Sequence, residues 1–420
     1  MLIRRPTPLA RILVPAGLAT LFALQGTAVS AQTEAQLSRA RALHDRVMTL
    51  DTHVDINPAN FTPERSYATK LPTQVNLPNM EAGGLDAVFL IVYVGQNGEL
   101  NEAGYARAKA QAMEKFDAID RLVTELAPQR IGLAHTAAEA RAIYASGRKV
   151  ALIGVENGFP LGTDLGNVRL FAERGARYLS LAHNGHSQLS DSNTGERDGV
   201  WLYNGLSPLG KQVVAELNKW GIMVDISHPS KQSMMQTVAL SKAPIIASHS
   251  AVRALCDHSR NLDDEQLRAL ARNGGVAQIV AFNSYVKCQS DSPERQRALA
   301  DLREKFGRAG AADRAAFQQA MADLNAKYPP PPRATVAEFV NHLDYAVKLI
   351  GIDHVGISSD FDGGGGVDGW SDASETFNVT LELVKRGYTD EQIEKLWSGN
   401  LLRVMEEVER IGKRLRGEAS

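Results

Sequence analysis

Short apolar stretches rich in Val, Ile and Leu recur along the chain, and stretches of helical character separate them. Eight of them have the length and β-branched content of buried strands: Met48–Ile56, Ala87–Val94, Val150–Glu156, Tyr178–His183, Met223–His228, Pro244–His249, Gly275–Phe282 and His354–Asp360. The segments predicted as helices include Thr136–Ala145, Asn167–Gly175, Pro208–Trp220, Ser230–Ser241 and Asp263–Asn273. Strands that alternate with helices form right-handed βαβ units, and eight such strands predict a closed (β/α)8 TIM barrel.

A His, Glu or Asp stands at the carboxyl end of most of these strands. His53 and Asp55 lie two positions apart in the first strand, so their side chains point to the same face of the sheet. Five later strands end on Glu156, His183, His228, His249 and Asp360. Because the active sites of such barrels lie at the carboxyl ends of the strands, the pattern predicts one active site together with the fold.

Five of these residues form a set that suits a pair of zinc ions, or of another divalent first-row metal, since imidazole and carboxylate groups are common ligands of such ions. We expect His53 and Asp55 on one ion and His228 and His249 on the other, with Glu156 as a bridge between them. Two ions held this close can activate a bridging hydroxide and polarise the carbonyl group that it attacks. The cofactor predicted from the sequence is therefore two Zn²⁺ per chain.

The remaining strand ends supply candidates for proton transfer and substrate contact. Asp360 ends the last strand and is the expected general base and acid, with Asp362 as the less favoured alternative. His183 is expected to contact the substrate and stabilise the oxyanion, and His186 is its weaker rival. The other histidines are interpreted as structural or surface residues, and they are His44, His135, His258, His342 and His354.

Residues 1–31 have the features of a secretory signal, because three arginines precede an apolar core and a small-residue cleavage site follows it. We therefore expect an exported protein, periplasmic or secreted, without a stable membrane anchor. The remaining residues, 32–420, suffice for one barrel domain. The formal net charge of −2 and the absence of a basic run argue against a nucleic acid as partner.

Three further features of the sequence lie outside the predicted strands. Cys256 and Cys288 follow the sixth and seventh strands, and a disulfide between neighbouring loops is favoured over free thiols in an exported protein. The segment at about 289–332, between the seventh and eighth strands, is interpreted as a solvated helical insertion rather than a lid or a dimer contact. Glycines 363–366 are interpreted as a flexible loop rather than a phosphate-binding loop.

These residues match a known family. The matching segments follow one another along nearly the whole chain after residue 31, and they are Asp51–Asp55, Gly154–Glu156, Leu181–His183, Asp225–His228, Ser248–Ser250, Ser259–Asn261 and Ser359–Gly363. The chain resembles the membrane dipeptidase (renal dipeptidase) family of zinc peptidases, within the metal-dependent amidohydrolase barrels.

The resemblance implies the binuclear zinc site described above, with Asp360 as catalytic acid and base and His183 as a substrate contact. It also implies that Arg260 binds the terminal carboxylate of the substrate, with Tyr285 nearby, and that the protein is a homodimer. The pair Cys256 and Cys288 looks like a disulfide of that family.

The function expected from the sequence is that of a zinc-dependent dipeptidase, which uses a metal-bridging hydroxide to hydrolyse dipeptides. The family resemblance adds tolerance of a D-residue at the carboxyl-terminal position. One alternative is another amidohydrolase activity, such as an N-acyl-amino-acid deacylase or a lactonase. A second alternative is a zinc-stabilised binding protein without catalytic activity; the retention of Asp360 and of every ligand argues against it.

Overall fold

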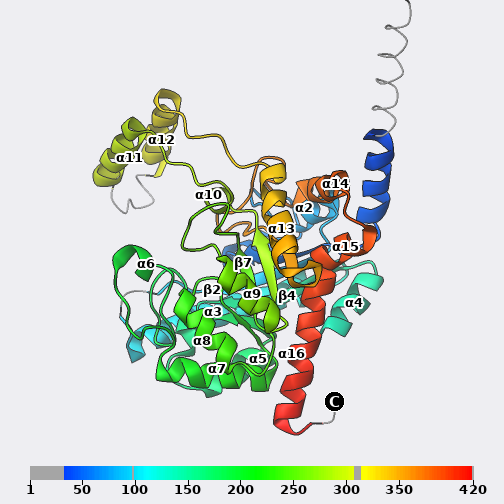
Figure 1. Ribbon diagram of the computed structural model, residues 1–420, viewed down its shortest axis with the longest axis vertical. Coiled ribbons are helices and arrows are strands. Elements are labelled where there is room, and N and C mark those ends of the chain that lie inside the picture. Colours follow the sequence, from blue (N-terminus) through cyan, green and yellow to red (C-terminus); the bar gives the residue numbers. More distant parts are fainter. Residues whose placement is uncertain (1–32, 97–98, 307–313, 419–420) are drawn as a thin grey trace, which may run out of the picture.

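A parallel β-barrel surrounded by helices forms the body of the protein (Figure 1). The computed structural model describes residues 33–96, 99–306 and 314–418. Its strands are β1 Leu50–Asp55, β2 Ala87–Tyr93, β3 Ile131–Leu133, β4 Lys149–Glu156, β5 Ala176–Ser180, β6 Met223–Asp225, β7 Ile246–Ser250, β8 Val276–Val280 and β9 Val355–Ser358. They are ordered β1-β2-β4-β5-β6-β7-β8-β9, and every pairing between them is parallel. The predicted TIM barrel is confirmed.

The barrel closes where the first strand meets the last. Val54 forms a parallel bridge with Phe361, and the Asp55 amide donates to the Phe361 carbonyl at 2.9 Å. The hydroxyl of Thr52 donates to the carbonyl of Ile357 at 3.0 Å across the same seam. Closure brings the carboxyl ends of all eight strands to one rim, including those that are 300 residues apart in the chain.

A short strand, β3, departs from the predicted set of eight. It pairs only with β4, at Lys149–Ala151, ahead of the positions where β5 pairs with the same strand. Three residues of strand carry too little periodicity to be recognised in the sequence. The strand lies at the amino-terminal side of β4, away from the rim formed by the carboxyl ends of the strands.

The helices lie outside the barrel, and several begin at the residues that the sequence indicates. Thr136, Ser230 and Asp263 each accept a hydrogen bond from a backbone amide in the first turn of a helix, which satisfies a donor that the helix leaves unpaired. The helices are α2 Leu77–Gly83, α3 Glu102–Arg121, α4 Ala137–Ala145, α5 Gly166–Glu173, α6 Gly195–Asp198, α7 Pro208–Trp220, α8 Lys231–Leu240, α9 Asp264–Arg272, α10 Asn283–Val286, α13 Val336–Ile350, α14 Phe377–Lys385, α15 Asp390–Glu394 and α16 Asn400–Arg416.

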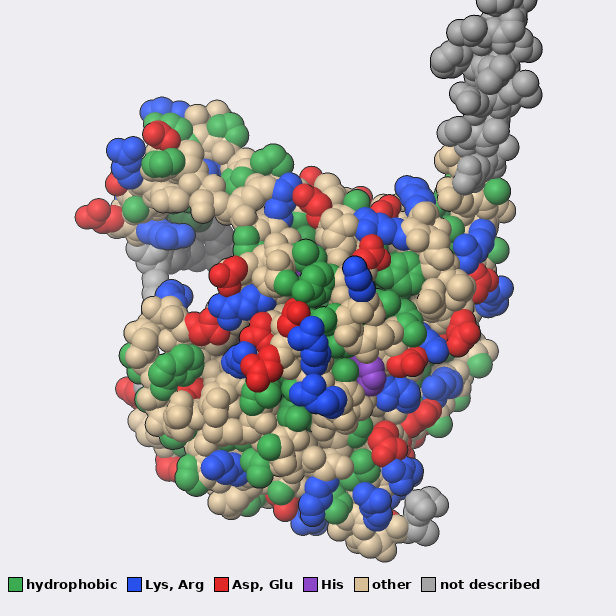
Figure 2. All heavy atoms as spheres, viewed as in Figure 1, with side chains coloured by type: hydrophobic (Ala, Val, Ile, Leu, Met, Phe, Trp, Pro, Cys, Tyr) green, Lys and Arg blue, Asp and Glu red, His purple; other side chains and the backbone are tan. Residues whose placement is uncertain are grey.

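Two more helices, α11 Pro293–Phe306 and α12 Arg314–Lys327, lie between β8 and β9 and project from the body of the protein (Figure 1). Nearly all of their described side chains are exposed or half-buried, with Arg295 and Leu324 as the buried ones. Figure 2 shows acidic and basic side chains interspersed over this face of the molecule, without a large patch of either sign. No described helix is long and apolar enough to cross a membrane. The predicted signal, residues 1–31, lies outside the described residues.

Candidate active site

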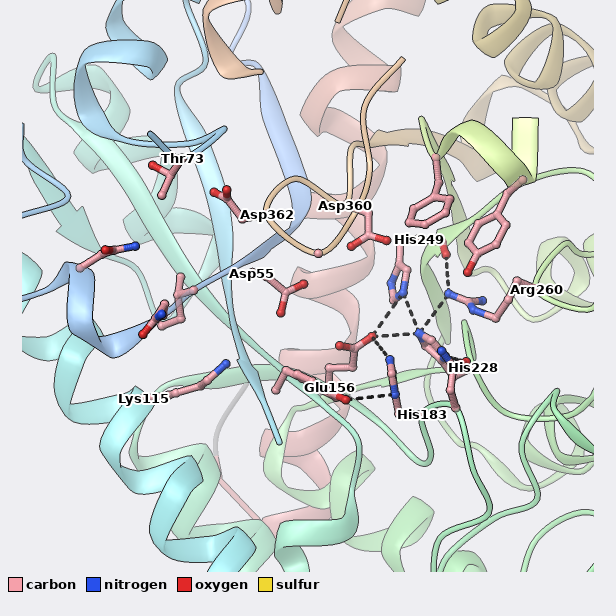
Figure 3. Close-up of a pocket in the computed structure, with 18 of the residues that line it drawn as sticks. Asp55, Thr73, Lys115, Glu156, His183, His228, His249, Arg260, Asp360 and Asp362 are labelled. Carbon is pink, nitrogen blue, oxygen red and sulfur yellow. Dashed lines mark hydrogen bonds and ion pairs between the residues drawn. The ribbon is translucent and has the colours of Figure 1, made fainter. Parts of the chain in front are cut away.

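A cavity of about 620 Å³ opens at the carboxyl ends of the strands, where the sequence predicts the active site. Its walls contain almost every candidate residue, as Figure 3 shows. The candidates that line it are Asp55, Glu156, His183, His228, His249, Arg260, Tyr285, Asp360 and Asp362. His53 lies directly behind them and is 1% exposed. Residues from the carboxyl ends of six different strands, β1, β4, β5, β6, β7 and β9, therefore meet in one place.

The carboxylate of Glu156 stands at the centre of the cluster. Its Oε1 atom lies 2.9 Å from Nε2 of His228 and 3.4 Å from Nε2 of His249. The same oxygen lies 3.7 Å from Nε2 of His53 and 3.9 Å from Nε2 of His183. Glu156 ends β4, which pairs with every residue of β2, so its position at the rim is fixed by the sheet.

A second group of ligand atoms lies on the β1 side of Glu156. Nε2 of His53 is 3.6 Å from Oδ2 of Asp55 and 4.0 Å from Oδ1 of Asp360. His53, Asp55 and Asp360 thus form one set of donors that could hold a metal ion, and Glu156, His183 and His228 form another. A third set, His53, Glu156 and His249, joins the two.

Hydrogen bonds behind the cluster orient two of the histidines. The Tyr178 hydroxyl donates to the Thr52 carbonyl at 3.0 Å, so its oxygen accepts from Nδ1 of His53 at 2.8 Å. Nδ1 of His228 lies 3.2 Å from Oδ1 of Asn184, which can only accept. In both rings the proton is therefore on Nδ1, and the lone pair of Nε2 faces the cavity.

His249 is oriented in the same way through a longer chain of hydrogen bonds. The Ser248 hydroxyl donates to Oδ2 of Asp225 at 2.8 Å and accepts from Nδ1 of His249 at 2.8 Å. The other oxygen of Asp225 accepts from the backbone amides of Ser248 at 2.7 Å and Ser227 at 3.2 Å. These side-chain bonds take the place of backbone hydrogen bonds between β6 and β7. Strand β6 therefore ends at Asp225, whereas the sequence predicts that it ends at His228.

The electrostatics of the cluster suit a divalent cation. Burial lowers the pKa of His228 and His249 well below the ordinary value, which leaves them neutral. Their Nε2 atoms are 3.0 Å apart, and two facing lone pairs at this distance repel each other unless a cation lies nearby. Burial alone would lower the pKa of His53, but Glu156 and Asp55 raise it well above the usual range.

The buried Nε2 of His53 has no hydrogen bond partner among the described residues. Negative charge that favours a proton on this atom equally favours a metal ion in the proton's place. Imidazole nitrogens whose other ring nitrogen is fixed, together with carboxylate oxygens, are the donor set of zinc enzymes. The residues present therefore fit the predicted metal.

Asp360 lies opposite this cluster on a strained segment of backbone. Its φ of 59° is in the left-handed region, which is uncommon for a residue with a Cβ atom and is typical of functional sites. Burial raises the pKa of its carboxyl group well above the ordinary value; His53 opposes this effect and Asp55 adds to it. A carboxyl group that gains and loses a proton closer to neutral pH is suited to acid and base chemistry.

Backbone hydrogen bonds hold the glycines after Asp360 against the site. The Gly365 amide donates to the Asp360 carbonyl at 2.7 Å, and the Gly366 amide donates to Ala281 at 2.7 Å. A Cβ atom on Gly363 would lie 2.2 Å from Oδ1 of Asp360 and 2.3 Å from Oδ2 of Asp55. A larger residue at this position would displace two carboxylates of the site, so the close approach favours glycine.

Arg260 lies beside the histidine cluster and is almost completely buried, with 2% of its surface exposed. Its Nη1 donates to the carbonyl of Ser227, and its Nη2 donates to the carbonyl of His249 at 3.1 Å and lies 3.1 Å from Nε2 of His228. The buried Nε has no partner among the described residues. The guanidinium carbon is 5.4 Å from the ring centroid of Tyr285.

A disulfide joins the two loops that carry Arg260 and Tyr285. The bond links Cys256 to Cys288, as predicted. Asn261 reinforces this connection, because its side-chain amide donates to the carbonyls of Cys256 and Tyr285, each at 2.8 Å. The loops after β7 and β8 are therefore held together at the edge of the cavity.

The alternative candidates have structural partners. Both oxygens of Asp362 accept backbone amides, from Gln74 at 2.9 Å and from Val75 at 3.1 Å. His186 lies 3.2 Å from the buried carboxylate of Asp191. Four of the remaining histidines bond to backbone groups, and they are His44, His258, His342 and His354.

A family model described as membrane dipeptidase (peptidase family M19) matches residues 37–419. The chain belongs to this family. It is therefore a hydrolase of a metallopeptidase family, and the metal that the family implies agrees with the donor set of the cavity.

The M19 chain is similar to curated and solved relatives along most of its length. It is 31% identical over 360 residues to dipeptidase tcpJ of Claviceps purpurea, covering 84% of this chain and 74% of the relative. The crystal structure of the probable dipeptidase PvdM from Pseudomonas aeruginosa has a TM-score of 0.79 at 32% identity, over 90% of this chain and 99% of that one. A Rhodobacter sphaeroides metallo peptidase, solved with a phosphinate mimic of L-Ala-D-Ala, shares the fold, with a TM-score of 0.67 at 22% identity over 86% and 99%.

Several residues that line the M19 cavity were not among the sequence candidates, and Tyr93 and Lys115 are two of them. Tyr93 ends β2, and its hydroxyl lies 3.4 Å from Nδ1 of His183. Lys115 belongs to α3 and reaches the cavity from the side (Figure 3). An aromatic residue at a strand end could have indicated Tyr93, whereas nothing in the sequence around Lys115 distinguishes it from a lysine on a helix surface.

Proposed function

We propose that this chain is a binuclear zinc dipeptidase. His53 and Asp55 would hold one ion, His228 and His249 the other, and Glu156 would bridge them. The observation that carries the proposal is the position of Glu156, whose Oε1 lies within 4 Å of Nε2 in four histidines. Bound ions would polarise the scissile carbonyl and activate the attacking water.

Arg260 is suited to hold the terminal carboxylate of the dipeptide. Its Nε and Nη2 share one edge of the guanidinium group, and such an edge binds a carboxylate with two parallel hydrogen bonds. Nε has no partner among the described residues. Nη2 lies close to Nε2 of His228, and it would become available to a substrate when that nitrogen binds a metal ion instead. The enzyme would thus select short substrates with a free carboxylate next to the scissile bond.

His183 and Asp360 would carry out the remaining steps. Nε2 of His183 faces the cluster, where it would stabilise the negative charge that develops on the carbonyl oxygen. Asp360 would accept the proton of the attacking water and pass it to the departing amine. Tyr285 would pack beside the substrate carboxylate on Arg260.

The proposal is tested by hydrolysis of L-Ala-L-Ala and L-Ala-D-Ala with metal-replete enzyme, chelated enzyme and Asp360→Asn. Turnover that requires metal, with about two zinc ions bound per chain, supports the binuclear site, and the ratio of the two rates decides tolerance of a D-residue. A loss of kcat in Asp360→Asn without loss of zinc supports its role in proton transfer. Absence of turnover on any dipeptide, with zinc bound, contradicts the proposal and leads to tests of N-acyl amino acids and lactones.

Export and dimerisation belong to the same proposal. The Cys256–Cys288 disulfide supports an oxidising compartment, such as the periplasm or the exterior of the cell. Cell fractionation and sequencing of the amino terminus of the purified protein would show whether residues 1–31 are removed. Light scattering coupled to gel filtration would decide whether the enzyme is a homodimer.

A further inference from the structure

Lys115 is a cation that projects into the substrate cavity. The side chain is half-buried, and its Nζ lies 5.7 Å from the ring centroid of Tyr93. It makes no hydrogen bond or ion pair within the part of the chain that the structure describes. A cation that is partly removed from water, with no carboxylate within ion-pair distance among the described residues, is positioned to bind an anion that enters the cavity.

Lys115 and Arg260 lie on opposite sides of the cavity (Figure 3). Lys115 belongs to the helix after β2, whereas Arg260 belongs to the loop after β7. In the closed order of eight strands, β2 and β7 are separated by four positions in either direction. The cluster around Glu156 lies between the two cations, so they would contact different ends of a bound substrate.

The direction in which a dipeptide binds then determines which part of it reaches Lys115. When Arg260 holds the terminal carboxylate and the scissile carbonyl lies over Glu156, the amino-terminal residue extends toward β1 and β2. Its ammonium group would be attracted by the carboxylates of Asp55 and Asp360. Its side chain is the remaining group that can reach Lys115.

The cavity has room for a long side chain at this end. A second hollow of about 590 Å³ adjoins it, and Asn57, Tyr93 and Lys115 line both. The cation of Lys115 is thus available to an acidic group of a substrate side chain that enters this end of the cavity.

We propose that Lys115 is a specificity-determining residue that selects dipeptides with an acidic side chain on the amino-terminal residue. This inference rests on the proposed dipeptidase function and names its substrate class. Lys115 acts on binding rather than on the reacting atoms, so its effect is expected mainly in KM.

The experiment compares L-Glu-L-Ala with L-Gln-L-Ala, which has the same shape without the charge. We expect the wild-type enzyme to have a kcat/KM about ten-fold or more higher for L-Glu-L-Ala, the size of effect that a charge-assisted hydrogen bond provides. Lys115→Met should bring the ratio close to one by lowering activity on L-Glu-L-Ala alone. Lys115→Arg should retain the preference because it keeps the charge.

Lys109→Met is the matched control, because Lys109 is on the same helix but bonds to Asn167 at 2.6 Å and lines neither cavity. It should leave the ratio unchanged. A wild-type ratio of kcat/KM near one overturns the inference, and so does an equal loss of activity on both substrates in Lys115→Met. In either case, hydrolysis of L-Gln-L-Ala would still support the proposed dipeptidase function. Absence of hydrolysis of either dipeptide by zinc-loaded enzyme overturns both.

Discussion

The two cations of the cavity differ in how firmly the protein holds them. Arg260 is 2% exposed and bonded to the backbone, and a disulfide ties its loop to the next one. Lys115 is half-buried, flexible in its four-carbon chain and without a bonded partner in the described structure. A fixed guanidinium suits a group that every dipeptide has, and a free ammonium suits a group that varies between substrates.

This contrast shows how one cavity can require a group that all substrates share and also prefer some substrates over others. Preorganised donors lose little entropy on binding and therefore contribute affinity for a group in one geometry. A mobile cation contributes less but tolerates anions at several positions. Four experiments follow in order of decreasing effect; two of them test the metal site between the two cations, and those on Arg260 and on the disulfide test this difference directly.

The largest effect is expected from Glu156→Gln, because this carboxylate is shared by both ends of the cavity. Activity on every dipeptide should fall by roughly three orders of magnitude or more, together with the zinc content. Steady-state kinetics and metal analysis by mass spectrometry would measure both. Glu173→Gln, an exposed glutamate paired with Arg169 at 2.7 Å, is the control. Retention of two zinc ions and of activity would contradict the central role of Glu156.

Arg260→Met should lower kcat/KM by about a hundred-fold for all dipeptides, whatever their first residue, because it removes the proposed bidentate contact with the substrate carboxylate. Dipeptide amides, which lack the carboxylate, should lose much less. Arg253→Met is the matched control, since Arg253 is on the same loop but pairs with Glu196 at 2.9 Å and Asp257 at 2.7 Å. An equal loss of kcat/KM on dipeptide amides and on free dipeptides would show that Arg260 does not bind the carboxylate.

Ser248→Ala tests whether the hydrogen bonds behind His249 matter for the metal. The substitution removes the acceptor of Nδ1 and one donor to Asp225. Affinity for zinc should fall by roughly ten-fold to a hundred-fold, as is typical when a hydrogen bond partner of a ligating histidine is lost. Competition with a chelator of known affinity would measure it, and an unchanged zinc affinity would rule out this orienting role.

The smallest change in activity is expected from the double substitution Cys256→Ser and Cys288→Ser. Loss of the disulfide should lower the free energy of unfolding by about 2–4 kcal/mol. Because the bond holds the loops of Arg260 and Tyr285, KM should rise a few-fold for all dipeptides. The preference between L-Glu-L-Ala and L-Gln-L-Ala should not change. A change in that preference instead would connect the disulfide to the Lys115 end of the cavity. Denaturant unfolding and kinetics supply the two readouts.

The sequence by itself determined the barrel and the group of residues at its mouth. His53, Glu156 and His249 are far apart in the chain, yet each is placed at the carboxyl end of an apolar strand. In a closed parallel barrel all of these ends meet at one rim, so the local pattern predicts a distant contact. The predicted disulfide follows the same logic, because its two cysteines lie in adjacent loops on that rim.

Only the tertiary structure decided which residues support and surround this site. Asp225 looks like any acidic residue at a strand end, but its carboxylate replaces the backbone ladder and orients His249 through Ser248. Lys115 lies on a helix, where direction depends on how that helix packs against the barrel. Strand ends are positioned by backbone hydrogen bonds that the sequence pattern reveals, whereas a side chain on a helix is positioned by packing between elements, which no local pattern records.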